Sequence, residues 1–174
     1  LDQCDISYAS DTNYGKGGLQ IDTDDALVSN CQIHHNRHTG LYSYLHGAAE
    51  IRATLTNVDV TDNGENGVYQ YASTSASIIF EWDGGEVSRN GRSGFYFSTN
   101  GGNIYPTLSN LTIQGNGAAG TSTGYQSGIY WGAHNIHPVL ENLVIADNVA
   151  AAAYWYCNGS ITAHNITATG NGVD

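Results

Sequence analysis

Residues 57–71 read NVDVTDNGENGVYQY, and this stretch decides the fold. It predicts a short alternating strand, a turn rich in asparagine and glycine, and a second short alternating strand. The same pattern starts 27 residues earlier at Asn30 and 27 residues later at Gly84, and further copies start at Asn110, Asn142 and Asn165. A strand-and-turn repeat with a period in the twenties is typical of a solenoid, in which each coil packs on its neighbours.

The composition restricts the class of protein and its partners. The chain has 174 residues, which fits one domain, and it opens inside a repeat, so we expect residues 1–174 to be a single domain excerpted from a longer solenoid. It carries 5 basic against 16 acidic residues, a formal net charge of −11. Nucleic acid requires a basic surface, so it is not an expected partner. We also expect no membrane span, because no apolar run approaches the required length of about 20 residues.

Each coil is predicted to contain a third short strand ahead of the asparagine position, at 51–55, 78–82, 104–108 and 136–140. This three-strand coil, with its Asn at the strand entry and Gly-apolar-Tyr after the turn, resembles the right-handed parallel β-helix proteins of the pectate-lyase-like superfamily. The resemblance implies an all-β fold: a right-handed, single-stranded parallel β-helix, or β-solenoid, of about six to seven rungs of three short strands. It implies little about activity, because one fold hosts many functions.

Positions one repeat apart are expected to stack in columns about 4.8 Å apart. One predicted inward column contains Ile6, Ile33, Val60, Val87, Ile113 and Ile145, and another contains Leu19, Leu41, Val68, Phe95 and Ile129. Cys4 and Cys31 share a third inward column. We expect a reduced pair there rather than a disulfide, because in-register parallel pairing gives poor disulfide torsions.

Two columns of asparagines are predicted to form structural ladders. The first contains Asn36, Asn63, Asn90, Asn116, Asn148 and Asn171, and the second contains Asn30, Asn57, Asn110, Asn142 and Asn165. The first column lies at the end of a strand, where we expect asparagine to adopt a left-handed backbone and to bond its own turn.

The tyrosines after the turn form a column on the predicted outer face. They are Tyr42, Tyr69, Tyr96, Tyr130 and Tyr154, flanked by Tyr44, Tyr71 and Tyr156. Alternation turns these rings outward, because the apolar residue between turn and tyrosine faces the core. Three interpretations remain open: a ladder that only rigidifies the sheet, a surface for stacking sugars, and an interface with another protomer or domain.

A second set of outward residues predicts a candidate catalytic site. Asp59 and Glu86 stack on adjacent rungs, and Asp62 lies between His35 and Arg89. Two carboxylates about 5 Å apart raise the pKa of one of them, which is the pairing that a glycosidase needs. Superfamily lyases are similar in using an Arg or Lys base with carboxylates. The alternative is a set of salt-bridged surface residues.

No cofactor is required, although calcium is possible. Asp22, Asp24 and Asp25 cluster at the exit of a strand and could offer oxygen ligands to Ca²⁺. A solvated acidic turn is the alternative.

These features favour an extracellular or cell-surface module that binds or processes a polysaccharide, as a lyase or hydrolase would. Whether the chain is an enzyme stays open. The alternative is a non-catalytic structural or adhesive rod that self-associates into a trimer or fibre, as a homo-oligomer or against a neighbouring domain.

Overall fold

The computed structural model describes residues 1–9, 17–118, 123–132, 135–156 and 158–172. These residues form two parallel sheets and one short 3-10 helix, η1 (Thr123–Gln126). The six-stranded sheet contains β2 (Gly17–Gln20), β5 (Thr39–Leu45), β8 (Val68–Ser73), β10 (Phe95–Asn100), β12 (Ile129–Trp131) and β14 (Ala153–Trp155).

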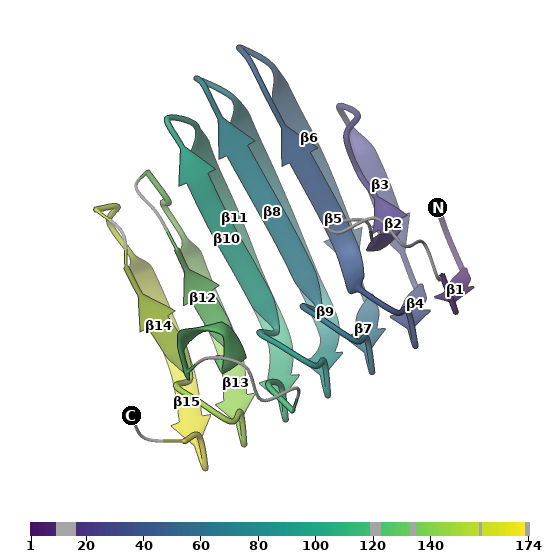
Figure 1. Cartoon of the computed structure of the whole chain (residues 1–174), viewed down its shortest axis with the longest axis vertical. Coiled ribbons are helices and arrows are strands. Elements are labelled where there is room, and N and C mark those ends of the chain that lie inside the picture. Colours follow the sequence, from purple (N-terminus) through teal and green to yellow (C-terminus); the bar gives the residue numbers. More distant parts are fainter. Residues whose placement is uncertain (10–16, 119–122, 133–134, 157, 173–174) are drawn as a thin grey trace.

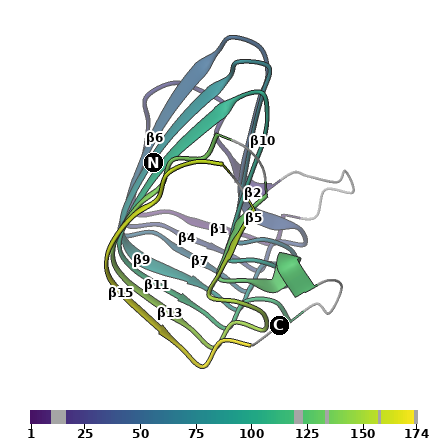
Figure 2. The ribbon, with the colours of Figure 1, turned by 90° about the vertical axis from the view of Figure 1, so that its left-hand side faces the viewer.

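The nine-stranded sheet wraps the rest of each coil (Figures 1 and 2). It contains β1 (Asp5–Ser7), β3 (Ala26–Ser29), β4 (Gln32–His34), β6 (Glu50–Thr56), β7 (Asp59–Thr61), β9 (Ser77–Ser88), β11 (Asn103–Gln114), β13 (Val139–Ala146) and β15 (Thr162–Thr169). With one strand of the six-stranded sheet in each coil, the described chain is a parallel solenoid of about six turns. The predicted all-β parallel β-helix is confirmed.

The third strand of one coil runs directly into the first strand of the next repeat in the middle of the molecule. In β9 and β11 the two segments are a single bent strand, and the bend falls at Gly84 and Asn110, whose φ values are +76° and +54°. A left-handed residue turns the chain without ending the ladder, which leaves Ile104 paired with Ile78 and Leu111 with Gly85. The predicted three short strands are therefore partly fused.

The predicted inward columns form the core. Ile33, Val60, Val87 and Ile113 are fully buried and pair in register from coil to coil, as do Leu41, Val68, Phe95 and Ile129. Large aromatic side chains fill the centre of the solenoid, where Phe97 stacks on Trp131 with ring centroids 4.8 Å apart. Ile6, Leu19 and Ile166 pack against this core and are only partly buried.

The first asparagine column is a continuous buried ladder, and Asn63 shows its geometry. Its Nδ2 donates to Asn90 Oδ1 (3.0 Å) and to the Ile33 carbonyl (3.1 Å), and its backbone N–H also donates to Asn90 Oδ1 (3.1 Å). Its own Oδ1 accepts from the Asn36 backbone N–H and Nδ2, and its carbonyl accepts from Gly91. Every polar atom of this residue, 2 % exposed, has a partner. The same bonds recur at Asn90, Asn116 and Asn148.

The left-handed backbone lies elsewhere than predicted for this column. The residue before each ladder asparagine has positive φ: His35, Asp62, Arg89, Gly115, Asp147 and Gly170. This turns the chain so that the following amide points inward, where it bonds the neighbouring coil instead of its own turn. The prediction of a ladder is confirmed, and its expected local geometry was wrong.

In the second asparagine column the asparagines themselves have a left-handed backbone, and their side chains are exposed. Asn30, Asn57, Asn110, Asn142 and Asn165 have φ between +52° and +54°. The side chain of Asn57 donates to Asn30 (3.0 Å), Asn142 to Asn110 (3.1 Å) and Asn165 to Asn142 (2.8 Å). Gly84 interrupts this ladder, and the Asn110 amide donates to Asp83 instead.

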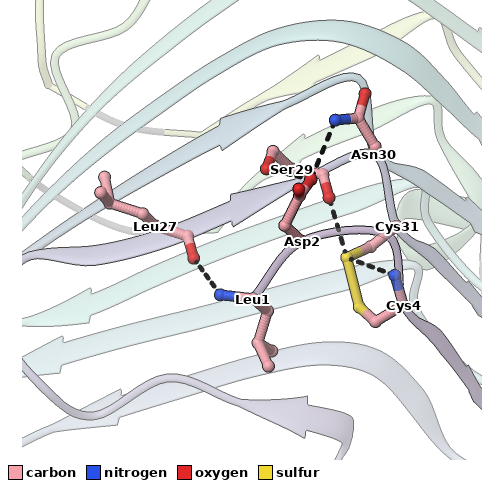
Figure 3. Close-up of a disulfide and its surroundings, with 7 residues drawn as sticks. All are labelled: Leu1, Asp2, Cys4, Leu27, Ser29, Asn30 and Cys31. Carbon is pink, nitrogen blue, oxygen red and sulfur yellow. Dashed lines mark hydrogen bonds between the residues drawn. A yellow bond between two sulfur atoms is a disulfide. The ribbon is translucent and has the colours of Figure 1, made fainter.

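Cys4 and Cys31 form a disulfide between the first two coils (Figure 3). The expectation of a reduced pair was therefore wrong. Stacking in one column sets the Cα atoms 4.6 Å apart, within the range that a disulfide spans. Beside it, the Asp2 carboxylate accepts from Ser29 Oγ (2.8 Å) and Asn30 Nδ2 (3.0 Å), so the exposed ladder ends on an acid.

We predict that Asn90→Ala lowers the free energy of unfolding by about 3 kcal/mol or more. The change leaves the Asn63 backbone N–H and one of the two Asn63 Nδ2 hydrogens without an acceptor, and it removes the side-chain donor to the Val60 carbonyl. Each buried group left unbonded costs about 1–3 kcal/mol. Urea unfolding measures the loss. The control is Asn57→Gly, which copies the glycine of the next coil and should change stability by less than about 1 kcal/mol. Equal losses in the two variants would contradict a dominant buried ladder.

Candidate functional site

The tyrosine column runs along the outer face of the six-stranded sheet. Tyr42, Tyr69, Tyr96, Tyr130 and Tyr154 pair in register on β5, β8, β10, β12 and β14. Successive ring centroids are 5.3, 5.0, 4.8 and 5.3 Å apart, with interplanar angles of 16°, 5°, 13° and 4°. The predicted tyrosine column is thus a single parallel stack.

Within this stack the ring faces cover one another. Parallel rings at the coil spacing leave no room for a third ring between them, so a sugar cannot lie flat on Tyr69 or Tyr96. What the column presents to solvent is a row of ring edges and hydroxyl groups, one per coil. This narrows the sugar-stacking interpretation to edge contacts and hydrogen bonds.

Burial raises the pKa of Tyr42 and Tyr130 to about 12, and the neighbouring tyrosines add to the effect. The pKa values of Tyr69 and Tyr96 are raised for the same reasons. The hydroxyl groups therefore stay protonated far above neutral pH and can both donate and accept hydrogen bonds.

Tyr125 extends the aromatic surface sideways and was missed by the sequence analysis. It lies on η1, and its ring stacks beside Tyr130 (5.0 Å) and Tyr96 (5.7 Å). It belongs to an insertion between β11 and β12 that has no counterpart in the neighbouring coils, so the repeat holds no signal for its position.

The flanking tyrosines form a shorter second column. Tyr44 and Tyr71 stack with centroids 4.8 Å apart, and the His46 ring packs edge-on against Tyr44. The same column continues with Ser98 and Gly132 before it reaches Tyr156, which is 67 % exposed. The second column is therefore interrupted for two coils.

The candidate catalytic residues form a charged ridge on the outside of β7 and β9. Arg89 binds Asp62 through two hydrogen bonds of 2.9 Å and approaches Glu86 at 3.4 Å. Asp59 Oδ1 accepts the backbone N–H of Glu86 at 3.0 Å. His35 is placed differently: its ring stacks on Tyr8, and its Nδ1 lies 2.7 Å from Nδ1 of His34. The structure thus groups four of the five predicted residues through direct contacts.

The charges of this ridge do not produce the predicted raised carboxyl pKa at Glu86. The Ser88 hydroxyl, the Gln114 amide and Arg89 together hold the pKa of Glu86 below its usual value. Arg89 lowers the pKa of Asp62 in the same way, mainly through their hydrogen bonds. A general acid needs a raised pKa, so the Glu86 carboxyl is tuned for ionisation rather than for proton donation.

Two of the three acidic residues of the calcium hypothesis, Asp22 and Asp24, have hydrogen-bond partners for their carboxylates within the protein. Asp22 accepts hydrogen bonds from the Tyr44 backbone N–H (3.2 Å) and the Gln20 side chain, and Asp24 accepts from the Asp25 backbone N–H (3.0 Å). Among the described residues, no three His, Cys, Asp or Glu side chains are grouped as a metal site. Calcium binding there stays a prediction.

Two shallow hollows lie on the outer face of the nine-stranded sheet, away from both tyrosine columns. The larger, of about 350 Å³, is lined by residues that include Leu27, Arg52, Ile79 and Glu81. The smaller, of about 200 Å³, shares Thr54 and Glu81 with it. Sequence periodicity did not identify them, because a hollow depends on the relative lengths of outward side chains.

Residues 17–173 match the family model described as "Right handed beta helix region". The chain belongs to this right-handed β-helix family. No curated protein matches the chain, and no solved structure does. Membership of the β-helix family fixes the fold and the handedness of the coil, and leaves the ligand to be argued from the surface. The described part of this β-helix also contains no helix with the length and apolar character of a membrane span.

We predict that the charged ridge stabilises this β-helix most at neutral pH and loses that effect in acid. The pKa values of Asp62 and Glu86 are lowered in the folded state, so their contribution is present above the unfolded-state pKa and disappears as the pH falls through the folded-state pKa. Arg89→Gln should cost up to about 1 kcal/mol at neutral pH, because the pair is partly exposed.

Urea unfolding at neutral pH and near pH 3 tests this, because the cost of Arg89→Gln should shrink at the lower pH. Arg52→Gln is the control for loss of one positive charge, since Arg52 pairs with Glu50 elsewhere on the surface. If Arg89→Gln costs as much stability in acid as at neutral pH, the ionised Asp62 and Glu86 are not the source of the stabilisation.

Proposed function

We propose that this chain is an extracellular or cell-surface β-helix module that binds a linear polysaccharide along its tyrosine face. The observation that carries the proposal is the unbroken stack of five tyrosines, with one ring edge and one hydroxyl group in each of five successive coils. A polymer that lies along the solenoid axis meets an equivalent amphipathic group at each step of about 4.8 Å.

Three properties of the face support binding to a polyhydroxylated chain. The hydroxyl groups stay protonated and can both donate and accept hydrogen bonds. The rings are held by their neighbours, so little side-chain entropy is lost on binding. The ring edges add apolar contact beside each hydroxyl. An extracellular location is supported by the Cys4–Cys31 disulfide, because such bonds persist in oxidising compartments.

Binding is favoured over cleavage by the state of the charged ridge. Arg89 is held in a bidentate pair with Asp62, and its pKa is raised by that partner, so it is a poor base. The lowered pKa of Glu86 disfavours a role as general acid. A lyase or hydrolase reaction at Asp59, Glu86, His35, Asp62 and Arg89 stays a prediction, and the proposed role of the module does not depend on it.

Self-association into a rod or fibre is the second candidate. It is favoured by the occupied ring faces, because a stack that presents only edges can pack flat against another sheet. Sedimentation across a concentration series separates the two roles: a concentration-dependent rise in mass, together with no polysaccharide binding, would favour the structural rod.

The decisive comparison uses Tyr69→Phe with Tyr96→Phe, and Tyr69→Ala with Tyr96→Ala. The phenylalanine pair keeps the stack and removes two hydroxyl groups, including the one of Tyr96 that bonds Tyr125. We therefore predict a melting temperature lowered by no more than the loss of that one hydrogen bond, and binding weakened more than tenfold, or about 1.4 kcal/mol. The alanine pair should lose binding and also stability. Affinity electrophoresis against a panel of polysaccharides measures retention.

Tyr105→Phe is the matched control for a lost hydroxyl group. Tyr105 is an exposed tyrosine on β11, on the other sheet, where it stacks on His137. The Tyr105→Phe variant should therefore bind the polysaccharide as tightly as the wild type does. Absence of retention on every polysaccharide, or unchanged retention in both double variants, would overturn the proposed function.

A further inference from the structure

We propose that the interruption in the second tyrosine column is a subsite for one uncharged sugar residue, which stacks on the free face of Tyr71. This inference rests on the proposed function, because it places one residue of the bound polymer. We call the interruption the Ser98 notch, defined by Tyr71, Ser98, Gly132 and Tyr156.

The register of the six-stranded sheet defines the notch. Ser98 pairs with Tyr71 on the preceding coil, and Gly132 follows Trp131, which pairs with Phe97. The Tyr156 backbone N–H donates to the Trp131 carbonyl, which places Tyr156 one coil after Gly132. From Tyr71 to Tyr156 there are three coil steps, or about 14 Å. The position after Tyr71 is therefore occupied by the hydroxymethyl group of Ser98. At the next position the Tyr130 ring lies over Gly132, where a Cβ would meet it, so the open step of the notch is the one at Ser98.

Tyr71 differs from the tyrosines inside the first column in having one face to offer. Its ring stacks on Tyr44 at 4.8 Å with an interplanar angle of 11°. Among the described residues no ring is stacked on its opposite face, toward Ser98, and the Ser98 side chain is too short to cover an aromatic ring. A pyranose there would take the place of the next ring in the stack, with its C–H groups against Tyr71.

The surroundings of the notch select an uncharged sugar. The outward neighbours in the first column are Tyr69, Tyr96 and Tyr130, and their raised pKa values keep these hydroxyl groups neutral. The strands that carry the notch and its neighbours, β8, β10, β12 and β14, contain no Lys or Arg to neutralise an acidic sugar, while the whole chain has a net charge of −11. A uronic acid would therefore meet repulsion without a local cation. The adjacent tyrosine hydroxyls offer hydrogen bonds to a neutral one.

The test is to fill the notch. Ser98→Tyr supplies the missing ring, which should stack on Tyr71 as the rings of the first column do and leave the melting temperature equal to or above that of the wild type. We expect it to weaken retention on a neutral polysaccharide at least tenfold. Ser98→Ala is the control, because it keeps the notch open, and it should lose less than threefold (under about 0.7 kcal/mol).

A second pair of variants keeps the proposal testable if Ser98→Tyr does not fold. Tyr71→Ala removes the platform and should abolish retention, whereas Tyr44→Ala removes the ring on its far side and should retain most of it. Equal retention in Ser98→Tyr and Ser98→Ala, or in Tyr71→Ala and Tyr44→Ala, would overturn the proposal that the notch binds a sugar. If the phenylalanine pair in the first column still loses binding in that case, the proposed function stands. A wild-type protein that binds charged polymers and no neutral ones would overturn the assignment of sugar class alone.

Discussion

The buried asparagine ladder is the interaction on which the rest of the structure depends. Each amide donates to the asparagine side chain of the next coil and to a carbonyl of the preceding one, and it accepts from the backbone N–H and the side chain of the preceding asparagine. A slip of one residue therefore breaks several buried bonds at once. Apolar columns alone would fix the register less strictly, because hydrophobic contact is not directional. The ladder thus converts a repeat of similar residues into a fixed register.

The tyrosine face follows from that register. Strand pairing sets the rings at the coil spacing, and at this spacing parallel rings fill the space between one another. A regular column therefore exposes edges, and a free face arises only where the column is broken. The interruption at Ser98 and Gly132 thus carries more chemical information than the tyrosines that repeat without a break.

Much of this could be predicted from the sequence, because a solenoid places identical positions on top of one another. The spacing of Ile33, Val60 and Val87 predicted the core, and that of Tyr42, Tyr69 and Tyr96 predicted the stack. The left-handed position was assigned one residue late, since the residues that occupy it, His35, Asp62 and Arg89, differ from coil to coil, whereas the asparagine after them repeats.

Other features depend on details that a repeat does not encode. Tyr125 joins the aromatic face from an insertion, and the pKa of Glu86 depends on Ser88, Gln114 and Arg89 together rather than on its spacing from Asp59. A reduced Cys4–Cys31 pair was expected because in-register parallel pairing typically gives poor disulfide torsions. The Cα separation in this column nevertheless permits the bond.

The most direct test of the account is the hydrogen exchange of asparagine side-chain amides, measured by NMR. We expect strong protection of the Nδ2 protons of Asn63, Asn90 and Asn116, which are buried and bonded between coils. We expect fast exchange for Asn57 and Asn142, whose ladder is exposed. Similar exchange rates in the two sets would contradict the claim that the buried ladder fixes the register.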